Sequence, residues 1–360
     1  MLYLAIDQHR KQLTVCDRNE AGDVTLRRQV STQWDRVRAF LAEYRDLAQG
    51  QGGFVAILEI CGFNDWLVEM LNEYDCLEVI LVQPEQRSKK KTDRRDANNL
   101  AETLWINRHR LIAGQPVQGL RRVHPPTPED AEARQLTAMR KRLGQTRTRT
   151  INRVKHLLRK HNVEQECPTK GLDTIRGQKW LKQLGFGPTD RLELDALLAQ
   201  WELCDRQIEQ IGAEIKQRQA MHKTAVLIET IPGCAAYSSL ALASRIGAIE
   251  RFPRPGSLAN YWGLTPGCRN SGDVTDRLGS ITKQGSSIVR FILGQLVLQV
   301  LRCDPKMKAW YLRIKKRRGA KIARVAVMRR LATIIWHMVK HNQPYIVGGP
   351  RCKRLQMQPV

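Results

Sequence analysis

The alternation of strand-like and helix-like segments in residues 1–105 restricts the fold of this chain more than any other feature. Three apolar runs separated by turn residues come first, and two later strand-like runs are each followed by helical spacing of apolar side chains. The predicted strands are 2–6, 13–17, 23–30, 54–60 and 77–82, and the predicted helices are 34–48, 63–74 and a segment through Trp105. This order predicts an α/β domain.

Four acidic residues stand where this order of elements would place catalytic carboxylates. Three strands, helix, strand, helix, strand, helix is the order of the ribonuclease-H-like fold, whose acids lie on the first strand, near the end of the fourth and at the start of a later helix. Asp7, Glu59, Asp93 and Asp96 occupy those places in this chain. Glu59 is the most informative, because an acid inside the apolar run FVAILEI is costly to bury without compensation.

Each of these acids also has a purely structural interpretation. Asp7 stands at a strand-to-turn junction, where aspartate is common, and Glu59 can lie at an exposed strand end. Asp93 and Asp96 suit the positive end of a helix dipole. The four together are harder to explain as loop chemistry than any one of them alone.

Residues 89–99, KKKTDRRDANN, combine two of the acids with a run of basic residues. If this stretch opens a helix, Asp93 and Asp96 share one face, and a divalent cation would offset their repulsion. Mg²⁺ prefers oxygen ligands and leaves room for substrate phosphate oxygens, with Mn²⁺ as a substitute. We therefore predict a site for one or two Mg²⁺ ions that serves phosphodiester cleavage, with the ligands Asp7, Glu59, Asp93 and Asp96.

The basic residues of this stretch are predicted to contact a polyanionic substrate; they are Lys89, Lys90, Lys91, Arg94 and Arg95. His9 and His109 lie near the acids in the sequence. We expect surface or hydrogen-bonding roles for both histidines, since a carboxylate site does not need an imidazole ligand.

The formal charge of +25 is concentrated after residue 115. Residues 1–115 contain 16 Lys and Arg against 17 Asp and Glu, whereas residues 116–360 contain 44 against 18. A near-neutral first part followed by a strongly basic remainder predicts that the second part makes most of the phosphate-backbone contacts.

Cysteine usage and the N-terminus argue against secreted and membrane classes. The nine cysteines include no C-x-x-C pair, which disfavours a zinc site or a disulfide framework and favours a reducing cytosol. The N-terminus has no basic region followed by an apolar run, and no segment reaches the roughly 18 apolar residues of a membrane span. We therefore predict a cytoplasmic, bacterial protein without a membrane partner, associated with the nucleoid when bound to DNA.

Residues 124–130, HPPTPED, predict a linker followed by a helix start. A long basic helix then runs to His161, and a second long helical pattern covers 191–223. The two can pair as an antiparallel or intermolecular coiled coil, or they can belong to an ordinary helical bundle. The predicted division is a catalytic domain at 1–115, a linker and long helices at 116–225, a C-terminal domain at 226–345 and a tail at 346–360.

Two motifs of the C-terminal domain bear on phosphate chemistry. Residues 230–235, TIPGCA, resemble a helix-hairpin-helix turn, whose backbone N–H groups bind phosphate, or they form a simple helix junction. Ser271 lies in a polar stretch between Arg269 and Lys283, both predicted to bind nucleic acid, and can present a nucleophilic hydroxyl or serve as a turn residue.

The last helical stretch is strongly basic. Residues 302–354 hold 16 Lys and Arg and a single acid, Asp304. Trp310, Tyr311 and Trp336 are interleaved with these charges and can stack on bases, although packing in a core is the default for each.

An ordered set of motifs across nearly the whole chain resembles the DEDD-type insertion-sequence transposases, which are bridge-RNA-guided DNA recombinases with a RuvC-like N-terminal domain. The motifs that carry the resemblance are AIDQHR around Asp7, ILEICG around Glu59, KTDRRDANNLAE around Asp93 and Asp96, TIPGC at 230–234, YWGLTP at 261–266, NSG at 270–272 and SITKQG at 280–285.

The resemblance implies a RuvC-like domain, a coiled-coil dimerisation element and a C-terminal transposase domain whose serine forms a covalent phosphoserine link with DNA. Ser271 matches that serine, although many relatives read Ser-Ser-Gly-Gly where this chain reads Asn-Ser-Gly-Asp at 270–273. The implied partners are a guide (bridge) RNA, donor and target double-stranded DNA, and further copies of the chain in a dimer or tetramer.

Two alternatives stay open on the sequence alone. A RuvC-like nuclease or junction resolvase would hydrolyse DNA with the acids and form no covalent link. A non-catalytic RNA- or DNA-binding scaffold would need none of the four acids, and their joint presence argues against it.

Overall fold

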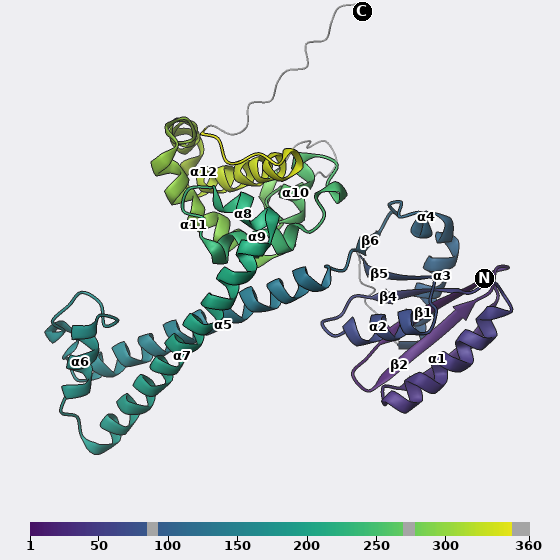
Figure 1. Cartoon of the computed structure of the whole chain (residues 1–360), viewed down its shortest axis with the longest axis horizontal. Helices are drawn as coiled ribbons and strands as arrows, with labels where there is room; N and C mark the ends of the chain where they lie inside the picture. Colours follow the sequence, from purple (N-terminus) through teal and green to yellow (C-terminus); the bar gives the residue numbers. More distant parts are fainter. Residues whose placement is uncertain (85–92, 269–277, 348–360) are drawn as a thin grey trace, which may run out of the picture. The chain divides into compact units, whose positions relative to one another are not determined.

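The computed structural model describes residues 1–84, 93–268 and 278–347, which form two compact units, 1–125 and 126–360 (Figure 1). The first unit is a six-stranded sheet with the strand order β3-β2-β1-β4-β5-β6. Its strands are β1 (Leu2–Gln8), β2 (Gln12–Arg18), β3 (Val24–Ser31), β4 (Phe54–Glu59), β5 (Glu78–Pro84) and β6 (Leu120–Val123). β1, β4 and β5 run parallel, and β2, β3 and β6 pair antiparallel with their neighbours.

Helices cover both faces of this sheet. They are α1 (Trp34–Gln49), α2 (Asp65–Glu73), α3 (Asp93–Ile106) and the short α4 (Arg108–Ile112). Alternate residues of β1 point to opposite faces. Leu2, Leu4 and Ile6 pack with α1 and α2, whereas Tyr3 and Ala5 pack with α3. Burial on both faces explains why the central strands read as nearly continuous apolar runs.

The predicted α/β class and the predicted order of strands and helices in residues 1–105 are confirmed. β6 is an addition that sequence periodicity did not indicate, because it is a short strand of two apolar and two basic residues. It pairs with β5, and the first compact unit extends to Pro125.

The second unit is mainly helical. Its helices are α5 (Pro128–Lys160), α6 (Ile175–Gln183), α7 (Pro188–Met221), α8 (Lys223–Glu229), α9 (Ala236–Ile246), α10 (Pro255–Tyr261), α11 (Ser287–Cys303) and α12 (Pro305–His341), with 3-10 turns at Glu164–Glu166 and Ile249–Arg251. A two-stranded sheet pairs β7 (Pro266–Cys268) with β8 (Leu278–Ile281). α5 begins as predicted after the proline-rich linker, where the Thr127 hydroxyl accepts the Asp130 N–H at 3.2 Å.

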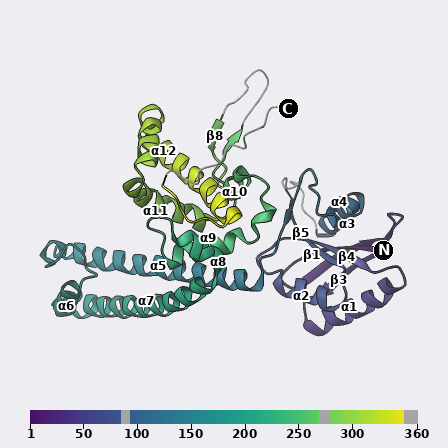
Figure 2. The ribbon, with the colours of Figure 1, turned by 45° about the horizontal axis from the view of Figure 1, so that its top comes forward.

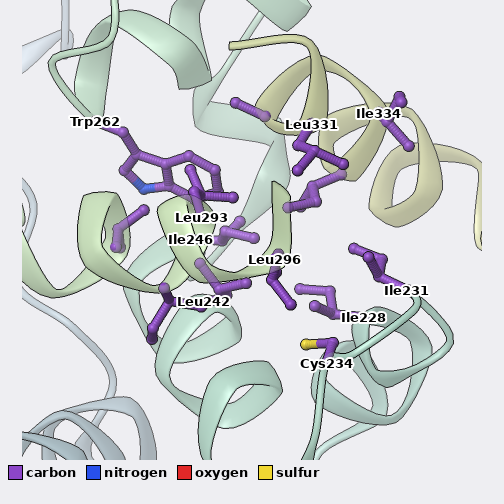
Figure 3. Packing of buried hydrophobic residues seen from close by; sticks show 14 of the residues in the cluster. Ile228, Ile231, Cys234, Leu242, Ile246, Trp262, Leu293, Leu296, Leu331 and Ile334 are labelled. Carbon is purple, nitrogen blue, oxygen red and sulfur yellow. The ribbon is translucent and has the colours of Figure 1, made fainter. Parts of the chain in front are cut away.

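The two long helices α5 and α7 pack antiparallel within the chain (Figure 2). Ion pairs follow this direction, because Glu132 pairs with Arg218 near one end and Lys160 pairs with Asp190 at the other. An apolar cluster that includes Val154, Leu158, Leu198 and Trp201 joins the ends next to α6. Helices α8 to α12 enclose a separate and larger core, part of which is shown in Figure 3.

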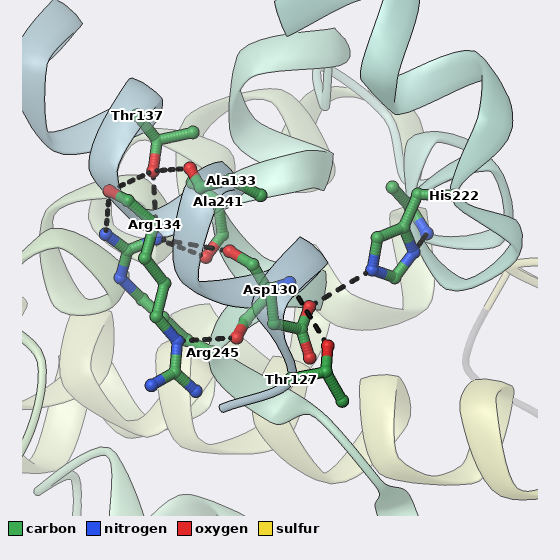
Figure 4. A network of polar contacts seen from close by, with 10 residues as sticks. Thr127, Asp130, Ala133, Arg134, Thr137, His222, Ala241 and Arg245 are labelled. Atoms are coloured by element: carbon green, nitrogen blue, oxygen red, sulfur yellow. Dashed lines mark hydrogen bonds and ion pairs between the residues drawn. The ribbon is translucent and has the colours of Figure 1, made fainter. Parts of the chain in front are cut away.

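A polar network joins the first turns of α5 to α9 (Figure 4). Arg245 is buried and donates to the Thr137 hydroxyl and the Ala241 carbonyl at 3.0 and 2.9 Å. Arg134 donates to the Ser244 carbonyl at 2.7 Å. Burial and the nearby Arg134 charge lower the pKa of Arg245 to about 10. These bonds satisfy a guanidinium that would otherwise be costly to bury.

Among the described residues, no helix is both long enough and apolar enough to cross a membrane.

Candidate catalytic and nucleic-acid-binding site

Asp7 and Glu59 occupy level positions on neighbouring parallel strands. The register pairs Ile6 with Leu58, so Asp7 and Glu59 follow side by side at the carboxyl ends of β1 and β4. Neighbouring strands lie roughly 4.8 Å apart. Asp7 has the same alternation as Tyr3 and Ala5, so both carboxylates belong to the face that α3 covers. The burial of Glu59 is intermediate, not complete.

Helix α3 begins at Asp93, so the KKKTDRRDANN stretch does open a helix. Ala97, Leu100, Ala101 and Leu104 of α3 pack against the sheet. Asp96 continues this stripe toward the start of the helix, because residues three and four apart share one face. Asp96 is half-buried. The side chains of Asp93 and Arg94, and all of Lys89, Lys90 and Lys91, lie outside the described part of the chain.

A buried amide pair holds the ends of these two strands. The Asn64 side chain donates to the Gln8 side-chain oxygen at 2.9 Å and to the Glu59 carbonyl at 3.3 Å. Gln8 in turn donates to the Phe63 carbonyl at 2.9 Å, and the Cys61 N–H donates to Asn64 at 2.5 Å. This network joins the residue after Asp7 to the loop after Glu59.

Sequence reasoning missed Gln8 and Asn64. The signal was available for Gln8, because a polar residue stands at a position of β1 whose alternation with Leu4 and Ile6 predicts burial. Gln8 and Asn64 are 6% and 3% exposed. Buried amides of this kind are normally hydrogen-bonded, and here they are.

His9 lies next to the acid of the first strand. Its Nε2 atom is 3.1 Å from the Asp7 carboxylate, with 45% of the His9 side chain exposed and 15% of the Asp7 side chain. The predicted hydrogen-bonding role of His9 is confirmed. This contact couples the orientation of Asp7 to the turn between β1 and β2.

The donor set at the strand ends suits a hard divalent cation. Mg²⁺ is usually bound by one or two carboxylates together with waters and substrate phosphates, and Asp7 and Glu59 offer two carboxylates side by side. Within the part of the chain that the structure describes, no three His, Cys, Asp or Glu side chains form a group that could hold a metal ion. The Asp93 carboxylate lies outside that part.

Two motifs that flank residues 269–277 in the sequence pack against each other, and we call this contact the base. Gly263, in YWGLTP, and Gly285, in SITKQG, have positive φ angles of 67° and 76°. A side chain on Gly263 would lie 2.1 Å from the Gln284 carbonyl, and one on Gly285 would lie 2.1 Å from the Tyr261 carbonyl. Arg290 donates to the carbonyls of Trp262, Gln284 and Gly285. Ser271 and Arg269 themselves lie outside the described residues.

Lys283 is exposed within this base and has a positive φ of 55°. Its N–H donates to the Gly263 carbonyl at 3.2 Å, so its backbone is held while its side chain faces solvent. Sequence reasoning did not predict the role of Arg290, because its three carbonyl acceptors belong to two segments that are far apart in the sequence.

The TIPGC segment forms a tight turn between α8 and α9. Gly233 has a φ of 80°, and a side chain there would lie 2.5 Å from the Gln299 side chain on α11. Ile231 and Cys234 are buried in the helical core (Figure 3). The turn therefore packs as a helix junction.

Exposed basic residues gather on α12 around Gly319, where a φ of 83° interrupts the helix. We call this set the α12 basic segment; its members are Arg313, Lys315, Lys316, Arg317, Arg318, Lys321 and Arg324. Trp336 is not available for base stacking, because it is 8% exposed and its Nε1 donates to the Phe252 carbonyl at 2.8 Å. Trp310 and Tyr311 are partly buried against the helical core. The default prediction that these aromatic side chains pack in a core is therefore confirmed.

Two family models match successive parts of the chain. Residues 4–163 match a transposase family model of the DEDD type from the IS110 group, and residues 225–312 match the model described as the transposase IS116/IS110/IS902 family. The transposase for insertion sequence element IS1111A of Coxiella burnetii is 25% identical over 364 residues, covering 96% of this chain and 92% of the relative.

A second relative, named "Probable family 20 transposase", comes from Pseudomonas aeruginosa. It is 24% identical over 323 residues, covering 85% of this chain and 90% of the relative. Two family models in the same order as the motifs, together with relatives that align over most of their length, establish the family. The chain belongs to the DEDD-type transposases of the IS110 family, which cleave and rejoin DNA.

Proposed function

We propose that this transposase is an RNA-guided DNA recombinase that excises and inserts a mobile element through a covalent phosphoserine intermediate. The observation that carries the proposal furthest is the level placement of Asp7 and Glu59 on neighbouring parallel strands, facing the helix that begins at Asp93. Such a placement suits the scissile phosphate of a DNA strand, whose non-bridging oxygens complete a carboxylate-bound cation site.

Ser271 is the proposed nucleophile. Its hydroxyl oxygen would bond to the scissile phosphorus as the bond from phosphorus to one bridging deoxyribose oxygen breaks, and the released oxygen would leave with a proton. Because the phosphoserine bond conserves the energy of the broken phosphodiester, strands can be exchanged and resealed without ATP. The motifs on either side of this serine in the sequence are held together by close backbone packing at Gly263 and Gly285 and by the hydrogen bonds of Arg290.

Asp7, Glu59, Asp93 and Asp96 are the proposed ligands of Mg²⁺, which Mn²⁺ can replace. When bound, this cation would polarise the phosphate and stabilise the negative charge that develops on it. The residues of the chain would position it: the Gln8–Asn64 pair holds the strand ends, and His9 orients the Asp7 carboxylate. A serine hydroxyl needs such assistance, since it is a weak nucleophile at neutral pH.

The basic second unit is the proposed main contact for nucleic acid. Lys283 and the α12 basic segment present exposed cations, as does Arg95 in the first unit. A guide RNA would read donor and target DNA by base pairing, and the protein would bind backbones. We further propose that copies associate as a dimer or tetramer through α5 and α7, and that the serine of one copy can join the acids of another.

Covalent trapping tests the chemistry. Wild-type protein incubated with a nicked or suicide substrate should give a denaturant-resistant protein–DNA adduct, and Ser271→Ala should give none. Asp7→Asn should lose both adduct and cleavage. If Ser271→Ala cleaves DNA normally while Asp7→Asn does not, the chain is a RuvC-like nuclease that hydrolyses DNA with metal-activated water.

Sequencing the RNA that co-purifies with the protein tests guidance. The expected RNA has segments complementary to the DNA that flanks the gene and to its insertion sites. Protein that recombines DNA after complete RNase treatment and re-purification would contradict RNA guidance.

A further inference from the structure

A groove of about 590 Å³ lies between the β2–β3 edge of the sheet and α3. Its lining includes Thr14 and Cys16 of β2, Arg27 and Gln29 of β3, and Arg95 and Asn98 of α3. This volume falls within the range of roughly 300–1,000 Å³ that is usual for ligand sites. It is large enough for a phosphate with its attached sugar.

Strand register places this groove directly beside the candidate catalytic acids. Thr14 pairs with Asp7 across β1 and β2, and Gln29 pairs with Thr14 across β2 and β3. Directly paired residues have side chains on the same face of a sheet. Asp7, Thr14 and Gln29 therefore form one row that runs from the acids to the edge of the sheet.

The charge of the groove is opposite to that of the acids. Arg27 and Arg95 are exposed on its two walls, and no Asp or Glu is among the described residues that line it. Arg27 donates to the Asn98 side-chain oxygen at 3.0 Å, which joins the two walls and orients the guanidinium. Arg28 also lines the groove, but its guanidinium pairs with Glu43 at 2.8 Å. Arg27 and Arg95 thus give the groove its positive charge.

The Thr14 hydroxyl is a second, independent observation that indicates a ligand in this groove. The residue is 4% exposed, and its hydroxyl has no hydrogen-bond partner among the described residues. Buried hydroxyls in folded proteins nearly always have a partner, and each exception needs an explanation. A phosphate oxygen in the groove would accept the hydrogen bond that the protein leaves unmade.

We propose that this groove binds a phosphate of the DNA strand that neighbours the scissile phosphate, through Arg27, Arg95 and the Thr14 hydroxyl. The assignment rests on the proposed function, in which the acids receive the scissile phosphate. A strand held at Asp7 that continues along the row to Gln29 passes over Thr14 and between the two arginines. Guanidinium groups suit this role because they bind phosphate oxygens with two parallel hydrogen bonds.

The experiment replaces single phosphates on either side of the cleavage site with neutral methylphosphonates in a DNA junction of the element. Wild-type protein should cleave one of these substrates about 10-fold more slowly, the loss expected for one charge-assisted hydrogen bond. Arg27→Ala and Arg95→Ala should cleave unmodified DNA about 10-fold more slowly, and the same methylphosphonate should slow each of them less than it slows wild type, because one of the phosphate contacts is already missing. Arg36→Ala, on α1 at the opposite face of the sheet, is the matched control and should remain as sensitive as wild type.

Thr14→Val separates binding from folding. Valine has the shape of threonine without the hydroxyl, and that hydroxyl makes no bond within the described residues. The melting temperature should therefore not fall, while cleavage of unmodified DNA should fall several-fold.

Three outcomes would overturn the groove assignment. In the first, wild-type protein cleaves every methylphosphonate substrate as fast as unmodified DNA. In the second, the methylphosphonate slows the arginine variants as much as it slows wild type. In the third, the arginine variants lose affinity for RNA but cleave DNA at the normal rate. Asp7→Asn, tested on the same substrates, reports on the acids. If Asp7→Asn cleaves normally, the proposed function is wrong. If Asp7→Asn is inactive and the arginine variants behave as wild type, only the groove assignment is wrong.

Discussion

The Gln8 side-chain oxygen accepts a hydrogen bond from the Asn64 side chain at 2.9 Å, which fastens the end of β1 to the loop after β4. Asp7 and Glu59 are the residues whose positions depend on this contact. Their carboxylates belong to one face of the sheet, and the amide pair lies on the other. The hydrogen bond between Asn64 and Gln8 thus fixes the relative positions of Asp7 and Glu59, although the carboxylates of these two acids take no part in it.

Asn64→Ala should lower catalysis more than it lowers stability. The change removes bonds to Gln8, Glu59 and Cys61 and leaves buried partners unsatisfied, a loss of about 1–3 kcal/mol in the free energy of unfolding. Cleavage should fall at least 10-fold at temperatures where the variant is fully folded, because the strand ends lose their common support. Asn19→Ala removes a turn bond to Asp23 far from the acids and should keep full activity. Equal activity losses in the two variants would contradict this role.

Gly263→Ala should disrupt the base that the YWGLTP and SITKQG motifs form. Alanine disfavours the φ of 67°, and its Cβ would lie 2.1 Å from the Gln284 carbonyl. The loss of stability should exceed about 1 kcal/mol, and covalent adduct formation should fall. Gly256→Ala is the matched control, because nothing lies within 4 Å of its Cβ position in α10. A thermal melt and an adduct assay on both variants give the answer, and an active, stable Gly263→Ala would refute the packing argument.

Asp17 makes stability depend on pH. It is fully buried and accepts bonds from Thr25 and Tyr44 at 2.5 and 2.9 Å, and burial raises its pKa above the usual 3.8. Because the folded chain holds this proton more tightly than the unfolded chain, the stability that it contributes is present below pH 3.8 and is lost as pH rises through the folded pKa.

Asp17→Asn, which cannot ionise, should therefore be at least as stable as wild type at neutral pH, with an advantage that shrinks on acidification. Melting curves of both proteins across this range measure the difference. An advantage that grows toward low pH would show that the carboxylate is stabilising in its ionised form.

The α12 basic segment should control the salt dependence of binding. Each phosphate contact contributes a slope of about 0.9 in the logarithm of affinity against the logarithm of salt concentration. Changing Lys315, Lys316, Arg317 and Arg318 to Gln should lower that slope by about 0.9 for each phosphate contact that these residues make. Three Arg→Gln changes on α1, at Arg36, Arg38 and Arg45, are the control and should leave the slope unchanged. An unaltered slope in the α12 variant would exclude this segment from the interface.

The amino-acid sequence by itself determined the order of strands and helices in residues 1–105, the helix that opens in the KKKTDRRDANN stretch and the start of α5 after the proline-rich linker. These features depend on periodicity, caps and turn residues within a few positions of one another. The two acids in strands were also visible, because Glu59 interrupts an apolar run and Asp7 ends one.

Only the tertiary structure decided which residues meet. The level placement of Asp7 and Glu59, the bond between Gln8 and Asn64, and the groove between Arg27 and Arg95 all depend on strand register and on the seating of α3. β6 joined the sheet for the same reason, since backbone pairing with β5 does not require a strong apolar pattern. Register between strands far apart in the chain depends on which of their faces are buried together. Periodicity within one strand does not predict which residue of another strand lies beside it.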